Sequence, residues 1–117
     1  MTRSIVLEFE SFSMNAKLFD TPVADSLYQS LPQQISLTHW GKEMYGSVQG
    51  RHGEHQPVPR IPEGGLAYTD DGQYFCIFFG QNPAWPVEHV GRITDGDLSP
   101  LHNSALKNVT VKKINDR

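Results

Sequence analysis

The stretch YFCIFFGQNP, residues 74–83, holds six apolar or aromatic residues in a row, followed by Gly80 and a proline-containing loop. A strand with one wet face alternates apolar and polar residues, so an unbroken apolar run predicts a strand that is covered on both faces. In a closed barrel, one set of these side chains fills the interior. The outward set then needs a second cover, either a helix or the 49–64 segment, which is rich in proline and glycine.

Most of the remaining chain is typical of short strands separated by turns. The candidate strands are residues 3–10, 15–19, 34–40, 43–48, 64–69, 74–80, 87–94 and 108–114. Asp70-Asp71-Gly72 predicts a tight hairpin, because glycine readily takes the left-handed conformation. Eight strands are a natural number for closing a small barrel. We therefore predict a mainly β protein, a closed eight-stranded barrel forming a single domain over residues 1–117.

One segment, TPVADSLYQSLP at residues 21–32, has the pattern of a helix. Thr21 suits the N-cap and Pro22 the first helical position, while Pro32 ends the helix. An apolar stripe at four-residue spacing is formed by Val23, Leu27 and Leu31. A lone short helix is not stable in water, so this stripe is expected to lie against the sheet or to plug a barrel end.

Composition narrows the classes of partner and compartment. Ten Lys and Arg against thirteen Asp and Glu give a net charge of −3, with no basic cluster, which argues against a nucleic-acid partner. An apolar run of six is too short to span a membrane, and Glu8 and Glu10 interrupt any signal-peptide core. The single cysteine, Cys76, is expected to be a small buried side chain in a reducing compartment, so we expect a cytoplasmic protein.

Two separated blocks resemble a known family. HWGKEMYGSV, residues 39–48, and GGLAYTDDGQYFCIFFGQNP, residues 64–83, are similar to the small cyclophilin-like proteins of bacteria and archaea, usually described as a domain of unknown function. The shared patterns are Trp-Gly-x-Glu-aliphatic-Tyr and an aromatic strand ending Phe-Phe-Gly-x-x-Pro. The chain departs from the family at Gly65, where an Asp is usual, and at residues 69–72, where Trp-Pro-Pro-Gly is common. The resemblance implies a barrel with the cyclophilin topology and supplies no activity.

Binding of a small molecule or a peptide is the function that the sequence favours. Small barrels offer a concavity at the mouth or along one side, edged by loops, here 49–64 and 81–86. The candidate ligand-binding residues are aromatic rings with two polar anchors: His39, Trp40, Tyr45, Arg60, Tyr68, Phe79 and Trp85. Two alternatives stay open, that these rings form barrel core, or that the loop around Trp85 makes the protein a homo-oligomer. We expect no cofactor.

Peptidyl-prolyl isomerisation is the catalytic alternative that the cyclophilin fold suggests. Such an enzyme needs an apolar seat for the proline ring and a donor near the imide nitrogen. Arg60 or Arg92 could supply the donor. The Phe-His-Arg-aliphatic-Ile strand of active cyclophilins is not recognisable in this chain, and we therefore favour a protein that is not a catalyst.

Two further chemistries receive less support from the sequence. HGEHQ places His52, Glu54 and His55 close together, and imidazole with carboxylate suits zinc. The glycine and prolines around them are not those of a helical zinc motif, so we interpret these residues as a polar loop without a metal. Glu43 or Glu88 could act as a general acid or base, but we expect both to be exposed strand carboxylates, which are usually inert.

Overall fold

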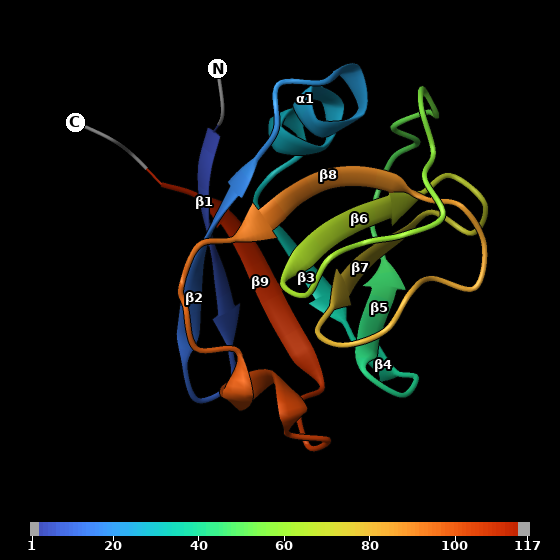
Figure 1. The fold of residues 1–117 in the computed structure, drawn as a ribbon. Helices are drawn as coiled ribbons and strands as arrows, with labels where there is room; N and C mark the ends of the chain where they lie inside the picture. The colour runs from blue at the N-terminus through green and yellow to red at the C-terminus, as the bar shows by residue number, and fades with distance from the viewer. Residues whose placement is uncertain (1–2, 115–117) are drawn as a thin grey trace.

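The computed structural model describes residues 3–114 as one continuous sheet that curls into a nearly closed barrel (Figure 1). Its nine strands within these residues run in the order β3-β9-β1-β2-β8-β6-β7-β5-β4, and every neighbouring pair is antiparallel. The strands are β1 (Arg3–Phe9), β2 (Ser13–Leu18), β3 (Gln33–Ser36), β4 (Thr38–His39), β5 (Glu43–Ser47), β6 (Gly65–Thr69), β7 (Tyr74–Phe78), β8 (Glu88–Ile93) and β9 (Asn108–Lys113). The predicted mainly β barrel is confirmed.

The strand count is nine rather than eight because the predicted strand 34–40 is broken at Leu37. Its first half, β3, pairs with β9, and its second half, β4, pairs with β5 at the opposite edge of the sheet. At the break, the Leu37 N–H donates to the Lys107 carbonyl oxygen at 2.7 Å. The chain thus crosses from one sheet edge to the other within one residue, which brings the two edges together.

Gly46 of β5 allows this closure. A Cβ atom at this position would collide with the carbonyl oxygen of Ser36 and with the side chain of Ile35, both in β3. Only glycine lets the two backbones approach so closely, so the barrel closes where the sequence provides a residue without a side chain.

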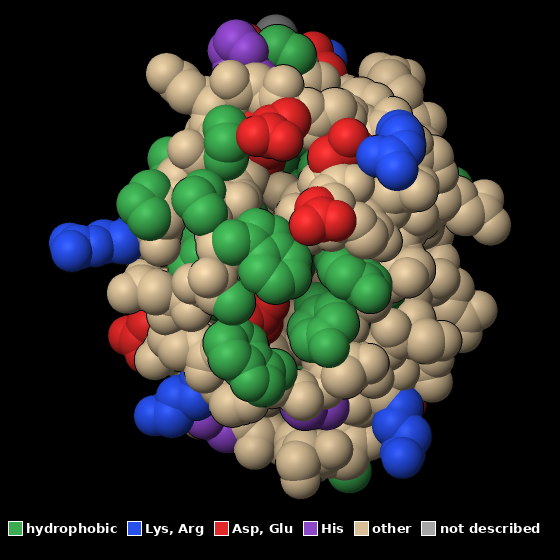
Figure 2. Space-filling model, turned by 90° about the vertical axis from the view of Figure 1, so that its right-hand side faces the viewer, with side chains coloured by type: hydrophobic (Ala, Val, Ile, Leu, Met, Phe, Trp, Pro, Cys, Tyr) green, Lys and Arg blue, Asp and Glu red, His purple; other side chains and the backbone are tan. Residues whose placement is uncertain are grey.

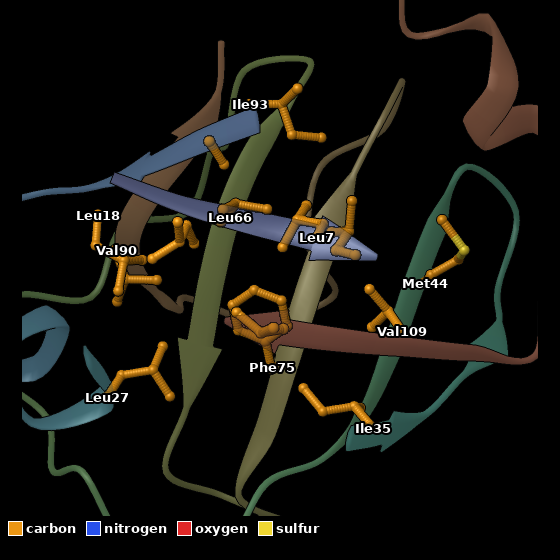
Figure 3. Close-up of a cluster of buried hydrophobic side chains, with 14 of the residues drawn as sticks. Leu7, Leu18, Leu27, Ile35, Met44, Leu66, Phe75, Val90, Ile93 and Val109 are labelled. Carbon is orange, nitrogen blue, oxygen red and sulfur yellow. The ribbon is translucent and has the colours of Figure 1, made fainter. Parts of the chain in front are cut away.

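The helix α1 (Pro22–Gln29) lies at one end of the barrel (Figure 1). The Thr21 side chain accepts a hydrogen bond from the Ala24 N–H at 3.3 Å, which confirms the predicted N-cap. The predicted stripe is buried, and Leu27 joins the same interior cluster as Phe75 and Val90 (Figure 3). A 3-10 helix, Ser99–His102, precedes β9. Within residues 3–114, no helix is long and apolar enough to cross a membrane.

Strand β7 is covered on both faces, as its composition predicts. Phe75, Ile77 and Phe79 belong to the interior cluster, whereas Cys76 and Phe78 belong to a second cluster on the outside of the sheet. The outer cover consists of Val58, Ile61 and Val87. The 49–64 loop therefore supplies part of the second cover, together with the segment that precedes β8, and the helix does not belong to this outer cluster.

Glu88 holds the 49–64 loop in place. Its side chain is only 5% exposed, and its Oε2 atom accepts hydrogen bonds from the backbone N–H groups of His55 and Gln56, both at 2.7 Å. The expectation of an exposed carboxylate at this position is wrong, because the loop folds over β8 and uses the carboxylate as an acceptor. Buried carboxylates are tolerated where such donors satisfy them.

Candidate ligand-binding site

A cavity of about 380 Å³ opens on the outer face of the sheet, beside β5, β7 and the loop between β7 and β8. Alternate residues of a strand face the same side, so Glu43 and Tyr45 of β5 share this face with Tyr74 and Cys76 of β7. The complete lining is Trp40, Glu43, Tyr45, Thr69, Tyr74, Cys76, Pro83, Ala84, Trp85 and Val87. Figure 2 shows hydrophobic side chains gathered around a hollow on this side of the molecule, with acidic atoms visible between them.

Two tryptophans form the rim of the cavity. Trp40 is 51% exposed and Trp85 is 47% exposed, and these are the most exposed large hydrophobic side chains of residues 3–114. The Trp85 Nε1–H donates to the Thr69 hydroxyl oxygen at 3.1 Å, which fixes the orientation of the indole ring. Deeper in the cavity, the rings of Tyr45 and Tyr74 pack edge to face with their centroids 5.1 Å apart.

Glu43 contributes the charged group of the cavity. Its side chain is only 7% exposed, and its Oε1 atom has no hydrogen-bond partner among the described residues. Burial raises the pKa of this carboxyl from 4.5 to about 7, and the Cys76 thiol and the Gln81 side chain offset part of that rise. The expectation that Glu43 is an exposed carboxylate is therefore wrong, because the loop between β7 and β8 covers this face of β5.

Cys76 lies next to Glu43 and is unsuited to nucleophilic chemistry. Its side chain is buried, and burial together with the negative charge of Glu43 raises the pKa of the thiol far above its ordinary value. The thiolate is the reactive form of cysteine, so Cys76 is an inert apolar part of the cavity wall.

Three of the seven predicted site residues, Trp40, Tyr45 and Trp85, line the cavity. Arg60 lies exposed on the 49–64 loop and does not line it. Arg92, the other donor considered for isomerisation, is exposed on β8 and does not line it either.

The other predicted strand residues point elsewhere. His39 directs its Nε2 atom to the carbonyl oxygen of Leu106 at 2.6 Å. Phe79 is buried in the barrel interior, where its ring packs edge to face on His102 with centroids 4.9 Å apart. Both side chains hold the barrel to the segment that precedes β9.

His52 and Tyr68 anchor the 49–64 loop. The His52 Nε2–H donates to the Gln49 carbonyl oxygen at 3.0 Å, and its Nδ1 atom shares a hydrogen bond of 2.8 Å with the Ser26 hydroxyl group. The fully buried Tyr68 accepts a hydrogen bond from the His52 backbone N–H and donates one of 2.7 Å to Asp70. Both ring nitrogens of His52 are thus engaged. Within residues 3–114, no three His, Cys, Asp or Glu side chains come together to hold a metal ion.

The sequence reasoning named none of six lining residues as a candidate: Thr69, Tyr74, Cys76, Pro83, Ala84 and Val87. It did expect the 81–86 loop, which contains Pro83 and Ala84, at the edge of the site, and it treated Glu43 only as an exposed acid. The alternation in strands 43–47 and 74–78 contained a signal for part of this set. It puts an acidic residue and two tyrosines on one face of neighbouring strands, close to Trp40.

The comparisons with known proteins concern the fold as a whole. The hypothetical protein AF2241 from Archaeoglobus fulgidus has a similar solution structure, with a TM-score of 0.79 and 22% identity over 96% of this chain and 95% of that one. McbB, solved in complex with tryptophan, has a TM-score of 0.77 and 16% identity over 97% of this chain, which spans only 45% of McbB. None of the curated proteins compared matches the chain. The sequence model of the family described as cyclophilin-like matches residues 3–112, so the chain belongs to the cyclophilin-like family.

Proposed function

We propose that this protein is a non-catalytic binder of a small molecule with an aromatic or apolar body, which it holds in the cavity between Trp40 and Trp85. The observation that carries the proposal is the pair of half-exposed tryptophans at the rim of a cavity of about 380 Å³. Small-molecule sites have this size, with mostly apolar walls and few polar groups. Exposed indole rings are costly to leave in water, and the Thr69 hydrogen bond orients Trp85 before any ligand arrives.

A neighbour of the same fold guides the choice of the first probe. McbB was solved in complex with tryptophan, an amino acid with an indole side chain. We therefore choose tryptophol, a neutral indole alcohol, because it presents an aromatic body without a charge.

Nuclear magnetic resonance of the ¹⁵N-labelled protein tests the proposal directly. The chain has two tryptophans, and both lie at the cavity, so their two indole N–H signals report its occupancy. Tryptophol is expected to shift both signals with one saturable dissociation constant. Trp85→Ala is expected to weaken binding strongly, whereas Trp85→Phe, which keeps a ring, retains most of the affinity.

Two results would contradict this function. The first is an absence of saturable shifts at millimolar tryptophol. The second is a shift of the two indole N–H signals when the protein concentration is raised without any ligand, which would show that the tryptophans form an interface between copies of the chain. The isomerase alternative stays a prediction. We do not favour it, because neither arginine considered as its donor lines the cavity.

A further inference from the structure

Glu43 is the feature of the cavity that an aromatic ligand alone does not explain. Its carboxyl group is more than nine-tenths buried, and its Oε1 atom has no partner among the described residues. The lining holds no Lys, Arg or His side chain that could neutralise it. Lys42, its neighbour in sequence, packs over Gly80 instead of lining the cavity. The Cys76 thiol and the Gln81 side chain satisfy this carboxyl only in part. A buried carboxylate without a counter-charge is unfavourable, so its Oε1 atom lacks a partner.

Glu88 shows how the same fold satisfies a buried carboxylate that has a structural role. The two side chains have nearly equal exposure, 5% for Glu88 and 7% for Glu43. Glu88 accepts two backbone N–H groups at 2.7 Å, whereas Oε1 of Glu43 accepts none and the side chain lines a cavity. The difference indicates that the partner of Glu43 Oε1 comes from outside the chain.

The chemistry around Glu43 favours a cation as that partner. The ring faces of Trp40, Tyr45, Tyr74 and Trp85 carry partial negative charge and attract a cation placed among them. A neutral donor could satisfy Oε1 but would leave the negative charge uncompensated, and an anion would be repelled. We propose that the ligand carries an ammonium-type nitrogen that binds the Glu43 carboxylate, while its aromatic or apolar body lies between the two tryptophans. This inference rests on the proposed function and specifies the class of ligand.

Such a ligand would bind with a characteristic pH dependence. Burial raises the pKa of Glu43 to about 7, so its carboxyl is about half protonated near neutrality. The other titratable groups that line the cavity are Tyr45 from β5 and Tyr74 and Cys76 from β7, and the raised pKa of the Cys76 thiol keeps it neutral. His39, on the adjacent β4, bonds to a backbone carbonyl instead. Because the cation needs the ionised carboxylate, its affinity should fall about tenfold from about pH 8 to about pH 6.

Three indole compounds of similar size separate the possible results. Tryptamine carries an ammonium group, tryptophol a hydroxyl group and indole-3-acetate a carboxylate. Each is titrated into the ¹⁵N-labelled full chain at both pH values and followed by the two indole N–H signals. We expect tryptamine to bind about tenfold or more tightly than tryptophol at the higher pH, and indole-3-acetate to bind weakest. The advantage of tryptamine should shrink about tenfold at the lower pH, as the free carboxylate becomes protonated.

Variants connect this preference to one carboxylate. Glu43→Gln keeps the side-chain size and removes the charge, so it should abolish both the advantage of tryptamine over tryptophol and the pH dependence of that advantage. Glu54→Gln, a matched change at an exposed loop position outside the lining, should alter neither. The pH series on the unmodified protein gives a second measurement that does not depend on how the variant folds.

The failures are distinguishable. If tryptophol binds but tryptamine binds no more tightly at the higher pH, the cation inference is overturned and the proposed function stands. If Glu43→Gln retains the preference for tryptamine, the ammonium group is recognised elsewhere and the inference is also overturned. If none of the three compounds binds, the proposed function and the inference both fail.

Discussion

Replacement of Glu43 by glutamine probes the electrostatics of the cavity without any ligand. Burial raises the pKa of this carboxyl from 4.5 to about 7 in the folded protein, whereas the unfolded chain exposes it to water. The folded state therefore holds the proton more tightly than the unfolded state. The stability that this group contributes is fully present below about pH 4.5 and is lost as the pH rises through 7.

The size of the effect follows from the two pKa values. A rise from 4.5 to about 7 corresponds to about 3 kcal/mol of folding free energy lost at about pH 8, and to less than about 0.5 kcal/mol near pH 4.5. Glutamine does not titrate. The free energy of unfolding of Glu43→Gln, relative to the unmodified protein, should therefore increase by about 3 kcal/mol over this range, equivalent to roughly 10 °C in Tm.

Urea unfolding of both proteins, followed by circular dichroism at several pH values, measures this difference. Any constant cost of placing an amide in the cavity cancels when the two ends of the pH range are compared. Glu54→Gln serves as the control, because its side chain is exposed and should leave the pH profile unchanged. If Glu43→Gln and the unmodified protein gave parallel profiles, the carboxyl would be solvated, and the burial argument would be refuted.

Three further predictions concern the barrel and its loops. Gly46→Ala should lower the free energy of unfolding in urea by about 2–3 kcal/mol, because the new Cβ would meet the carbonyl oxygen of Ser36. Gly96→Ala, with open space around it, should cost little, and equal losses in the two variants would contradict the closure of the barrel at Gly46. Glu88→Ala should cost about 2 kcal/mol in the same assay and accelerate proteolysis of the 49–64 loop, because two backbone N–H donors lose their acceptor. Unchanged protease resistance would contradict the role of Glu88 in holding this loop. Cys76 should resist alkylation by iodoacetamide in the folded protein and react in urea, because its thiol is buried and protonated in the folded state. Rapid labelling of the folded protein would contradict the burial of this thiol.

The barrel could be predicted because its signals are local. An unbroken apolar run at residues 74–79 requires cover on both faces, and hairpin turns separate the strands at short intervals. The helix was predicted from its N-cap and its apolar stripe. The break at Leu37 was not predicted, because both halves of that segment have strand composition. The closure of the barrel depends on contacts between residues distant in sequence, and only this closure sends β3 to one edge of the sheet and β4 to the other.

The cavity was predicted only in part, because its burial is created by a segment distant in sequence. Alternation places Glu43 and Tyr45 on the outer face of β5, a face that is normally wet in a small barrel. The loop from Pro83 to Val87 covers that face and converts an apparently exposed carboxylate into a buried one. Aromatic content alone also could not separate Trp85, which lines the cavity, from Phe79, which fills the barrel interior.

A crystal structure of the protein grown with tryptamine would examine the proposed site most directly. We expect the indole ring of the ligand to lie between Trp40 and Trp85, with its ammonium nitrogen within hydrogen-bond distance of Glu43 Oε1. A ligand held elsewhere on the molecule, or one that turns its ammonium group to solvent and leaves Glu43 without a partner, would contradict the proposed mode of binding.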